Sequence, residues 1–300
     1  MTELQKEIRK LKDAADALIL AHYYQTLDVQ DVADVVGDSF EMAKRARDAE
    51  ASTIVVCGVR FMAESAKILS PDKTVLLPAP DAGCPMADMV EPEDVLALRA
   101  KHPNALVMCY VNSSAATKAV SDVCCTSSSA VRIARKLDAE EIIFVPDRNL
   151  GRYVAEQVPE KKFYFHPGFC PIHDRVTVEQ VQKAKERYPN AVFAAHPECR
   201  EEVLALAEFI GSTAQIIGFS RETDAEEIII GTELGVLELL QREMPQKKIL
   251  SVSASFVCPN MKKNTLQDLY NALATGVHEI DLSREEIQAA KASLDRMIVL

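Results

Sequence analysis

The stretches VLLPAPDAGC (residues 75–84), FYFHPGFC (163–170) and ILSVSASFVC (249–258) each begin with an apolar run and end in a cysteine. The three cysteines lie 86 and 88 residues apart, at Cys84, Cys170 and Cys258. A fixed spacing of this length is typical of a chain that contains internal repeats. The sequence therefore predicts three similar structural units.

Three further features repeat with nearly the same spacing. An apolar run in each unit ends at a residue with a ring side chain. These residues are His22, Tyr110 and His196, and they lie 88 and 86 positions apart. Another run ends at Cys57, Pro146 and Gly231, and a helix-like segment starts at or near Ser39, Ser127 and Ser212. Because four features share one period, a single continuous, doubly wound sheet with strands recurring by chance is the weaker alternative.

The segments between the apolar runs are typical of helices. EPEDVLALRAKHP (91–103) and TVEQVQKAKERYP (177–189) place apolar residues three and four positions apart. Runs of β-branched residues that alternate with such helices predict parallel βαβ units, here with three strands per unit. The predicted fold class is α/β, with three similar αβα domains whose small parallel sheets surround a pseudo-threefold axis. We place the domains at residues 1–86, 87–174 and 175–262, followed by a C-terminal helical tail at 263–300.

The composition narrows the class of protein. The 34 Lys and Arg against 45 Asp and Glu give a net charge of −11, which argues against a nucleic-acid partner. No apolar stretch reaches the roughly 18 residues of a membrane-spanning helix. The N-terminal residues 1–16 have the pattern of a charged amphipathic helix rather than of a signal peptide. We therefore expect a cytoplasmic protein without a membrane partner, whose eight cysteines do not form a disulfide framework.

The repeated cysteines are candidate metal ligands. Ligands of parallel sheets bind beyond the carboxyl ends of the strands, so three equivalent loops around one axis would bring these thiols to one point. No C-x-x-C pair, as is usual for structural zinc, is present. A 4Fe-4S cluster normally takes four cysteines, so three would leave one iron open to act as a Lewis acid. The alternative is that all three are ordinary core residues, the role we expect for Cys57 and Cys109.

Polar residues after the first strand of each unit are candidates for substrate contact. His22, His196 and Glu198 suit proton transfer and carboxylate binding, and Tyr110 and Asn112 are neutral donors. Ser39, Ser127 and the Ser212-Thr213 pair lie at helix starts, where hydroxyls cap helices and also bind carboxylate or phosphate. This donor-rich set predicts an anionic small-molecule substrate.

The chain resembles the quinolinate synthase family of NAD biosynthesis. The matching motifs are AHYYQ from Ala21, YVNSSAATKA from Tyr110, CTSSSA from Cys125, PDRNLG from Pro146, PGFCPIH from Pro167, AHPEC from Ala195, IGTELG from Ile230 and CPNMKKNTL from Cys258. The resemblance implies a central active site and a 4Fe-4S cluster on Cys84, Cys170 and Cys258. It also implies condensation of iminoaspartate (iminosuccinate) with dihydroxyacetone phosphate to quinolinate, with loss of phosphate and two waters.

The same motifs carry over individual residues. The resemblance implies substrate contacts at His22, Ser39, Tyr110, Val111, Asn112, Ser127, His196, Pro197, Glu198 and Thr213. It implies catalytic roles for His22 and His196, and above all proton transfer by Tyr24 and Glu198. L-aspartate oxidase is a possible partner that supplies the labile imine. Two other functions stay open: an iron-sulfur hydro-lyase acting on a hydroxy acid, and a non-catalytic binding protein for a small acid.

Overall fold

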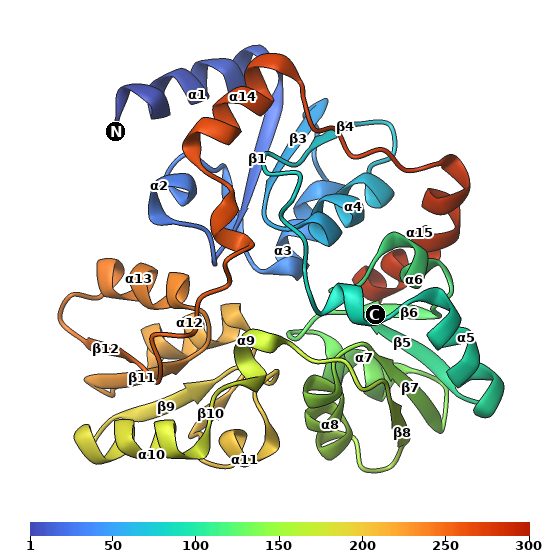
Figure 1. The fold of residues 1–300 in the computed structure, drawn as a ribbon, viewed down its shortest axis with the longest axis vertical. Coiled ribbons are helices and arrows are strands. Elements are labelled where there is room, and N and C mark those ends of the chain that lie inside the picture. The colour runs from blue at the N-terminus through green and yellow to red at the C-terminus, as the bar shows by residue number, and fades with distance from the viewer.

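The computed structural model describes residues 1–300 and contains three separate four-stranded sheets, all parallel (Figure 1). The first has the order β2-β1-β3-β4, with β1 Ala17–His22, β2 Val35–Gly37, β3 Thr53–Cys57 and β4 Thr74–Leu76. The second is β6-β5-β7-β8, with β5 Leu106–Tyr110, β6 Val123–Cys125, β7 Glu141–Val145 and β8 Lys162–Phe165. The third is β10-β9-β11-β12, with β9 Val192–Ala195, β10 Phe209–Ile210, β11 Glu227–Gly231 and β12 Lys248–Ser251.

Helices flank each sheet, and the three sheets surround the centre of the molecule in Figure 1. The first unit has α1 Glu3–Ala14, α2 Leu27–Gln30, α3 Ser39–Arg47 and α4 Arg60–Leu69. The second has α5 Pro92–Lys101, α6 Ala115–Ala119, α7 Ala130–Lys136 and α8 Arg148–Gln157. Then follow α9 Pro171–Asp174, α10 Val178–Arg187, α11 Glu201–Leu204, α12 Thr213–Glu222, α13 Leu234–Glu243, α14 Leu266–Thr275 and α15 Arg284–Val299. None of these helices is long and apolar enough to cross a membrane.

The predicted fold class is confirmed, but each sheet has one strand more than predicted. The additional strands are the edge strands β2, β6 and β10, which are two or three residues long. Segments this short carry no readable periodicity, and they become strands only because they pair with β1, β5 and β9. The repeat identified the other three strands of each sheet, including the edge strands β4, β8 and β12 that lead to the three cysteines.

The chain after the third sheet packs onto the first two units. In Figure 1, α14 lies beside α1, and α15 lies against α6 and β6. Ser293 of α15 donates a hydrogen bond to the Lys118 carbonyl in α6 (3.0 Å). The sheets themselves occupy residues 17–76, 106–165 and 192–251. The finer domain boundaries stay a prediction.

Shortening the buried Leu294 side chain, which packs α15 against the main core, should destabilise the fold. Leu294 has no exposed surface, so Leu294→Ala would leave a cavity at the base of α15, and we expect a loss of about 2–5 kcal/mol. Val299, 81% exposed at the end of the same helix, is the matched control, and Val299→Ala should change little. Urea unfolding of both variants tests this, and equal free energies of unfolding would contradict it.

Candidate active site

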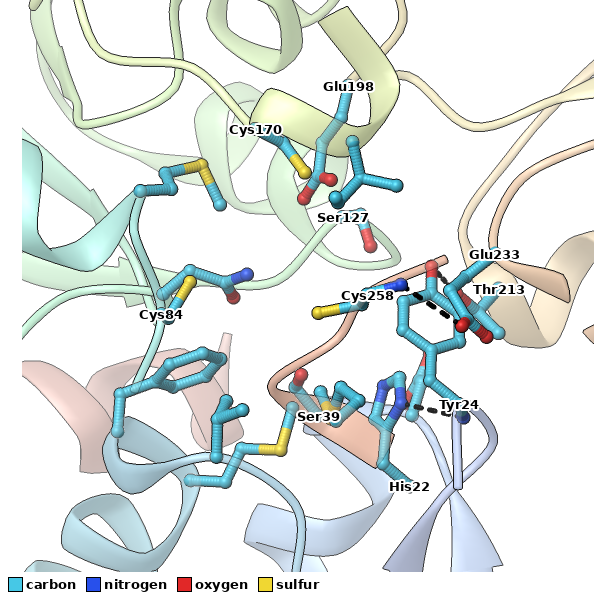
Figure 2. Close-up of a pocket in the computed structure, with 18 of the residues that line it drawn as sticks. His22, Tyr24, Ser39, Cys84, Ser127, Cys170, Glu198, Thr213, Glu233 and Cys258 are labelled. Carbon is cyan, nitrogen blue, oxygen red and sulfur yellow. Dashed lines mark hydrogen bonds between the residues drawn. The ribbon is translucent and has the colours of Figure 1, made fainter. Parts of the chain in front are cut away.

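A central cavity is lined by residues from all three units (Figure 2). The cysteines of the three repeated loops, Cys84, Cys170 and Cys258, line this cavity and also a second, outer cavity of about 400 Å³. In Figure 2 their thiols point into one shared space. The structure therefore brings together three side chains that are 86 and 88 residues apart in the sequence.

Most of the predicted site residues line the same cavity, and two do not. Those that line it are His22, Tyr24, Ser39, Tyr110, Asn112, Ser127, His196, Glu198 and Thr213. They meet because parallel strands present their carboxyl ends, and the loops that follow, at one edge of each sheet. Val111 and Pro197 are buried outside the cavity lining, and the Val111 N–H is bonded to the Cys125 carbonyl (2.9 Å). Substrate contacts by these two residues stay a prediction.

Of the three serines predicted to lie at helix starts, only Ser212 caps a helix. Ser212 caps α12, because its hydroxyl accepts from the Gln215 N–H (3.3 Å). In α3 the cap is instead the Asp38 carboxylate, which precedes Ser39 and accepts two backbone N–H groups (3.1 Å each). Ser127 lies in the turn before α7, so it does not begin the helix. The hydroxyls of Ser39 and Ser127 are thus not used as caps and lie at the cavity.

A chain of hydrogen bonds links the two predicted proton-transfer residues. The Tyr110 hydroxyl donates to Glu198 Oε1 (2.7 Å), and His173 Nδ1 lies 2.8 Å from Glu198 Oε2. His173 Nε2 lies 3.0 Å from the Thr232 hydroxyl, which lies 2.8 Å from the Tyr24 hydroxyl. All of these groups are at most partly exposed, so water competes little for the bonds.

Sequence reasoning assigned no role to His173, Thr232 or Glu233. Each nevertheless lies in a motif that matches the quinolinate synthase family. His173 is the last residue of PGFCPIH, and Thr232 and Glu233 are the third and fourth residues of IGTELG. The spacing of His173, three residues after Cys170, was the available signal, because a residue one turn away shares the same face of a short helix.

The histidines His22 and His196 are arranged alike. In each, Nδ1 accepts the backbone N–H of the residue two positions later, from Tyr24 (3.1 Å) and Glu198 (3.3 Å). The proton of a neutral imidazole therefore resides on Nε2, which makes each ring a donor. Burial lowers the pKa of both imidazoles to about 3.

These pKa values predict that His22 and His196 stay neutral across physiological pH. An unfolded chain protonates its imidazoles near pH 6.5. Between that pH and about 3 the folded state binds fewer protons, so the stability contributed by neutral burial is lost as the pH falls through this window. An NMR titration should show no midpoint between pH 5 and 8 for either ring. A midpoint near 6.5 for either would contradict the prediction.

The surroundings also shift the pKa of the Glu198 carboxyl and of two phenols at the cavity. Burial acts to raise the pKa of the Glu198 carboxyl, but the neighbouring imidazoles of His196 and His173 and the Tyr110 hydroxyl outweigh it, so that pKa lies below its ordinary value. Burial holds the pKa of the Tyr24 and Tyr110 phenols well above the usual range. The cavity thus combines the carboxyl groups of Asp38, Glu198 and Glu233 with several neutral donors.

The three thiols fit a metal cluster. All eight cysteines are free, and burial raises the pKa of Cys84 to about 12 and also raises that of Cys170 and Cys258. Such thiols stay protonated until a metal displaces the proton. The ligand atoms of Cys170, His173 and Glu198 lie within 4.8 Å of one another, close enough for a metal ion to be held there. Soft sulfur donors from three sides suit iron-sulfur ligation.

The remaining cysteines are fully buried. Cys57 and Cys109 lie in β3 and β5, which confirms their predicted place in the core. Cys124 and Cys125 form part of β6, and Cys199 packs in the core of the third unit. The structure therefore separates the eight thiols into three at the cavity and five in the core.

Fold and site together define a class of α/β protein in which three parallel sheets enclose a small-molecule cavity with thiols that can bind metal. The family model described as "Quinolinate synthetase A protein" matches residues 6–299. Similar proteins named quinolinate synthase occur in Caldicellulosiruptor bescii (51% identical; 98% of this chain, 97% of that protein) and Alkaliphilus metalliredigens (48%; 99% and 98%). This chain belongs to the quinolinate synthetase A family and is an enzyme.

Proposed function

We propose that this enzyme condenses iminoaspartate with dihydroxyacetone phosphate to form quinolinate, with loss of phosphate and two waters, in NAD biosynthesis. The observation that carries the proposal is one cavity that holds three convergent thiols and the hydrogen-bonded chain from Glu198 to Tyr24. Family membership over nearly the whole chain supports the same reaction.

In this proposal Cys84, Cys170 and Cys258 hold a 4Fe-4S cluster. With three cysteine ligands, such a cluster would keep one iron open and would supply a Lewis acid for the loss of water. The three thiols and the proposed substrate-binding residues line the same cavity, so the cluster would be held beside the reactants.

The neutral donors of the cavity hold the two anionic reactants. The Nε2–H groups of His22 and His196 donate to carboxylates, as do the hydroxyls of Ser39, Ser127 and Thr213 and the Asn112 amide. Because the donors project from all three units, they can place both reactants in one orientation, which raises the rate of carbon-carbon bond formation.

Glu198 and Tyr24 move the protons. Ionised Glu198 can take the proton that iminoaspartate loses as its nucleophilic carbon forms, and protonated Tyr24 can donate to a departing hydroxyl. His173 lies between Glu198 and Thr232, with Nδ1 2.8 Å from Glu198 Oε2 and Nε2 3.0 Å from the Thr232 hydroxyl. With its proton on Nε2, His173 can take a proton from protonated Glu198 at Nδ1 while Nε2–H gives its proton to Thr232. Thr232 in turn gives one to the Tyr24 phenolate, which returns Glu198 and Tyr24 to their starting forms.

An anaerobic assay tests the proposed reaction. The cluster-loaded protein is mixed with dihydroxyacetone phosphate and with iminoaspartate made by separate L-aspartate oxidase, and quinolinate is detected by mass spectrometry. We expect quinolinate only when both substrates are present. Turnover of a hydroxy acid without the triose would favour a hydro-lyase, and ligands returned unchanged would favour a binding protein.

The same assay tests the proposed partner. Faster turnover when L-aspartate oxidase is present in the mixture than when only the imine that it has made is added would support direct delivery.

A further inference from the structure

The three cysteine loops are joined to their sheets by equivalent backbone bonds. The first N–H of α4, α8 and α13 donates to a carbonyl two residues before the cysteine of the same unit. These bonds are Arg60 to Ala82 (2.8 Å), Arg148 to Gly168 (2.8 Å) and Leu234 to Phe256 (2.9 Å). This set of backbone bonds therefore does not distinguish the three cysteines.

Two buried carboxylates add a second bond in the second and third units. Asp147 Oδ2 accepts the backbone N–H of Cys170 (3.1 Å), and Glu233 Oε1 accepts that of Cys258 (3.2 Å). The other oxygen of each caps the helix that follows, through N–H groups such as Leu150 (2.9 Å) and Gly235 (2.6 Å). Both carboxylates have no exposed surface.

The first unit lacks this second bond. Val59 occupies the helix-cap position that corresponds to Asp147 and Glu233, and its side chain accepts nothing. The Cys84 N–H has no hydrogen-bond partner within the protein. The carbonyl of Cys84 accepts the Asp88 N–H (3.2 Å), as the carbonyls of the other two cysteines accept an N–H four residues later, so the three differ only in whether their own N–H is bonded.

We propose that Asp147 and Glu233 are positioning residues, which orient Cys170 and Cys258 for the metal. A bond to the cysteine N–H fixes the backbone from which Cβ and Sγ project, so the thiol needs less reorganisation when it binds. Lys262 braces Glu233, since its ammonium lies 3.2 Å from the carboxylate and also donates to the Tyr24 carbonyl. This inference rests on the proposed cluster.

Each carboxylate caps a helix and also accepts the N–H of a cysteine, and substitution by the isosteric amide separates these two roles. In Asp147→Asn and Glu233→Gln the amide oxygen can still cap the helix, but the NH₂ group then faces the cysteine N–H, so the ligand bond is lost while the cap stays. We expect these variants to assemble the cluster and to release iron to a chelator about tenfold faster or more than the unaltered protein. The iron-thiolate bands in resonance Raman spectra should also shift, because they depend on how the cysteine is oriented.

Matched controls come from carboxylates that bind strand N–H groups at the opposite end of the same sheets. Asp122 accepts from Val107 (2.7 Å) and Glu208 from Phe193 (2.8 Å). Asp122→Asn and Glu208→Gln should release iron at the unaltered rate. Release from Asp147→Asn and Glu233→Gln at that same rate, with unshifted bands, would overturn the inference.

A second measurement needs no variant. In the cluster-loaded, unaltered protein, hydrogen exchange resolved at the cysteines should be slower for the Cys170 and Cys258 amides than for the Cys84 amide. Equal rates would overturn the inference even if the variants fail to fold. An unaltered protein that assembles no cluster would overturn the proposed cofactor as well, whereas a loaded protein with unaffected variants removes only the positioning role.

Discussion

Replacing Cys258 with alanine is expected to remove the proposed 4Fe-4S cluster and with it all turnover. The same result is expected for Cys84→Ala and Cys170→Ala, because each thiol comes from a different unit and no other cysteine lines the central cavity. Two remaining thiols would leave half of the irons without protein ligands. Anaerobic analysis should find about four irons and four sulfides in the unaltered chain and close to none in each variant.

Cys57 provides the matched control for these substitutions. It is fully buried at the end of β3, outside the cavity, so Cys57→Ala removes a core sulfur without touching the proposed ligands. We expect full iron and sulfide content and a loss of about 1 kcal/mol in stability. Zinc in place of iron, or full iron retention in Cys258→Ala, would contradict the proposed cofactor.

Glu198→Gln is expected to lower turnover by about 10²- to 10⁴-fold while the cluster content stays unchanged. Glu198 is the carboxylate on which Tyr110 and His173 converge, and both bonds suit its ionised form. The amide keeps the size of the side chain but cannot take a proton from the substrate. Steady-state rates from the anaerobic assay, with iron measured on the same samples, provide the test.

Glu208→Gln is a suitable comparison, because Glu208 lies in the same unit but binds the Phe193 N–H away from the cavity. It should retain the unaltered rate. Full turnover by Glu198→Gln with an intact cluster would remove the proposed acid-base role. A loss of iron in that variant would instead assign Glu198 to the metal site, in keeping with its closeness to Cys170 and His173.

The sequence by itself determined the repeated architecture and the equivalence of the three cysteines. Long buried strands such as β3 and β7 are apolar runs with a local signature, and their recurrence at one period shows which loops correspond. Parallel sheets bind ligands at the carboxyl ends of their strands, so the residues after those strands could be predicted to form the site. His22, Tyr110 and His196 were found in this way, and the structure places all three at the cavity.

Only the tertiary structure decided which side chains touch across the units. The short edge strands carry no pattern of their own, and they exist because a longer neighbour offers unpaired N–H and C=O groups. In the sequence Asp147 and Glu233 cannot be told from ordinary helix caps, and nothing near His173 indicates that it meets Thr232, 59 residues away. Hydrogen bonds between loops depend on where the packed cores place those loops, and local periodicity does not encode that placement.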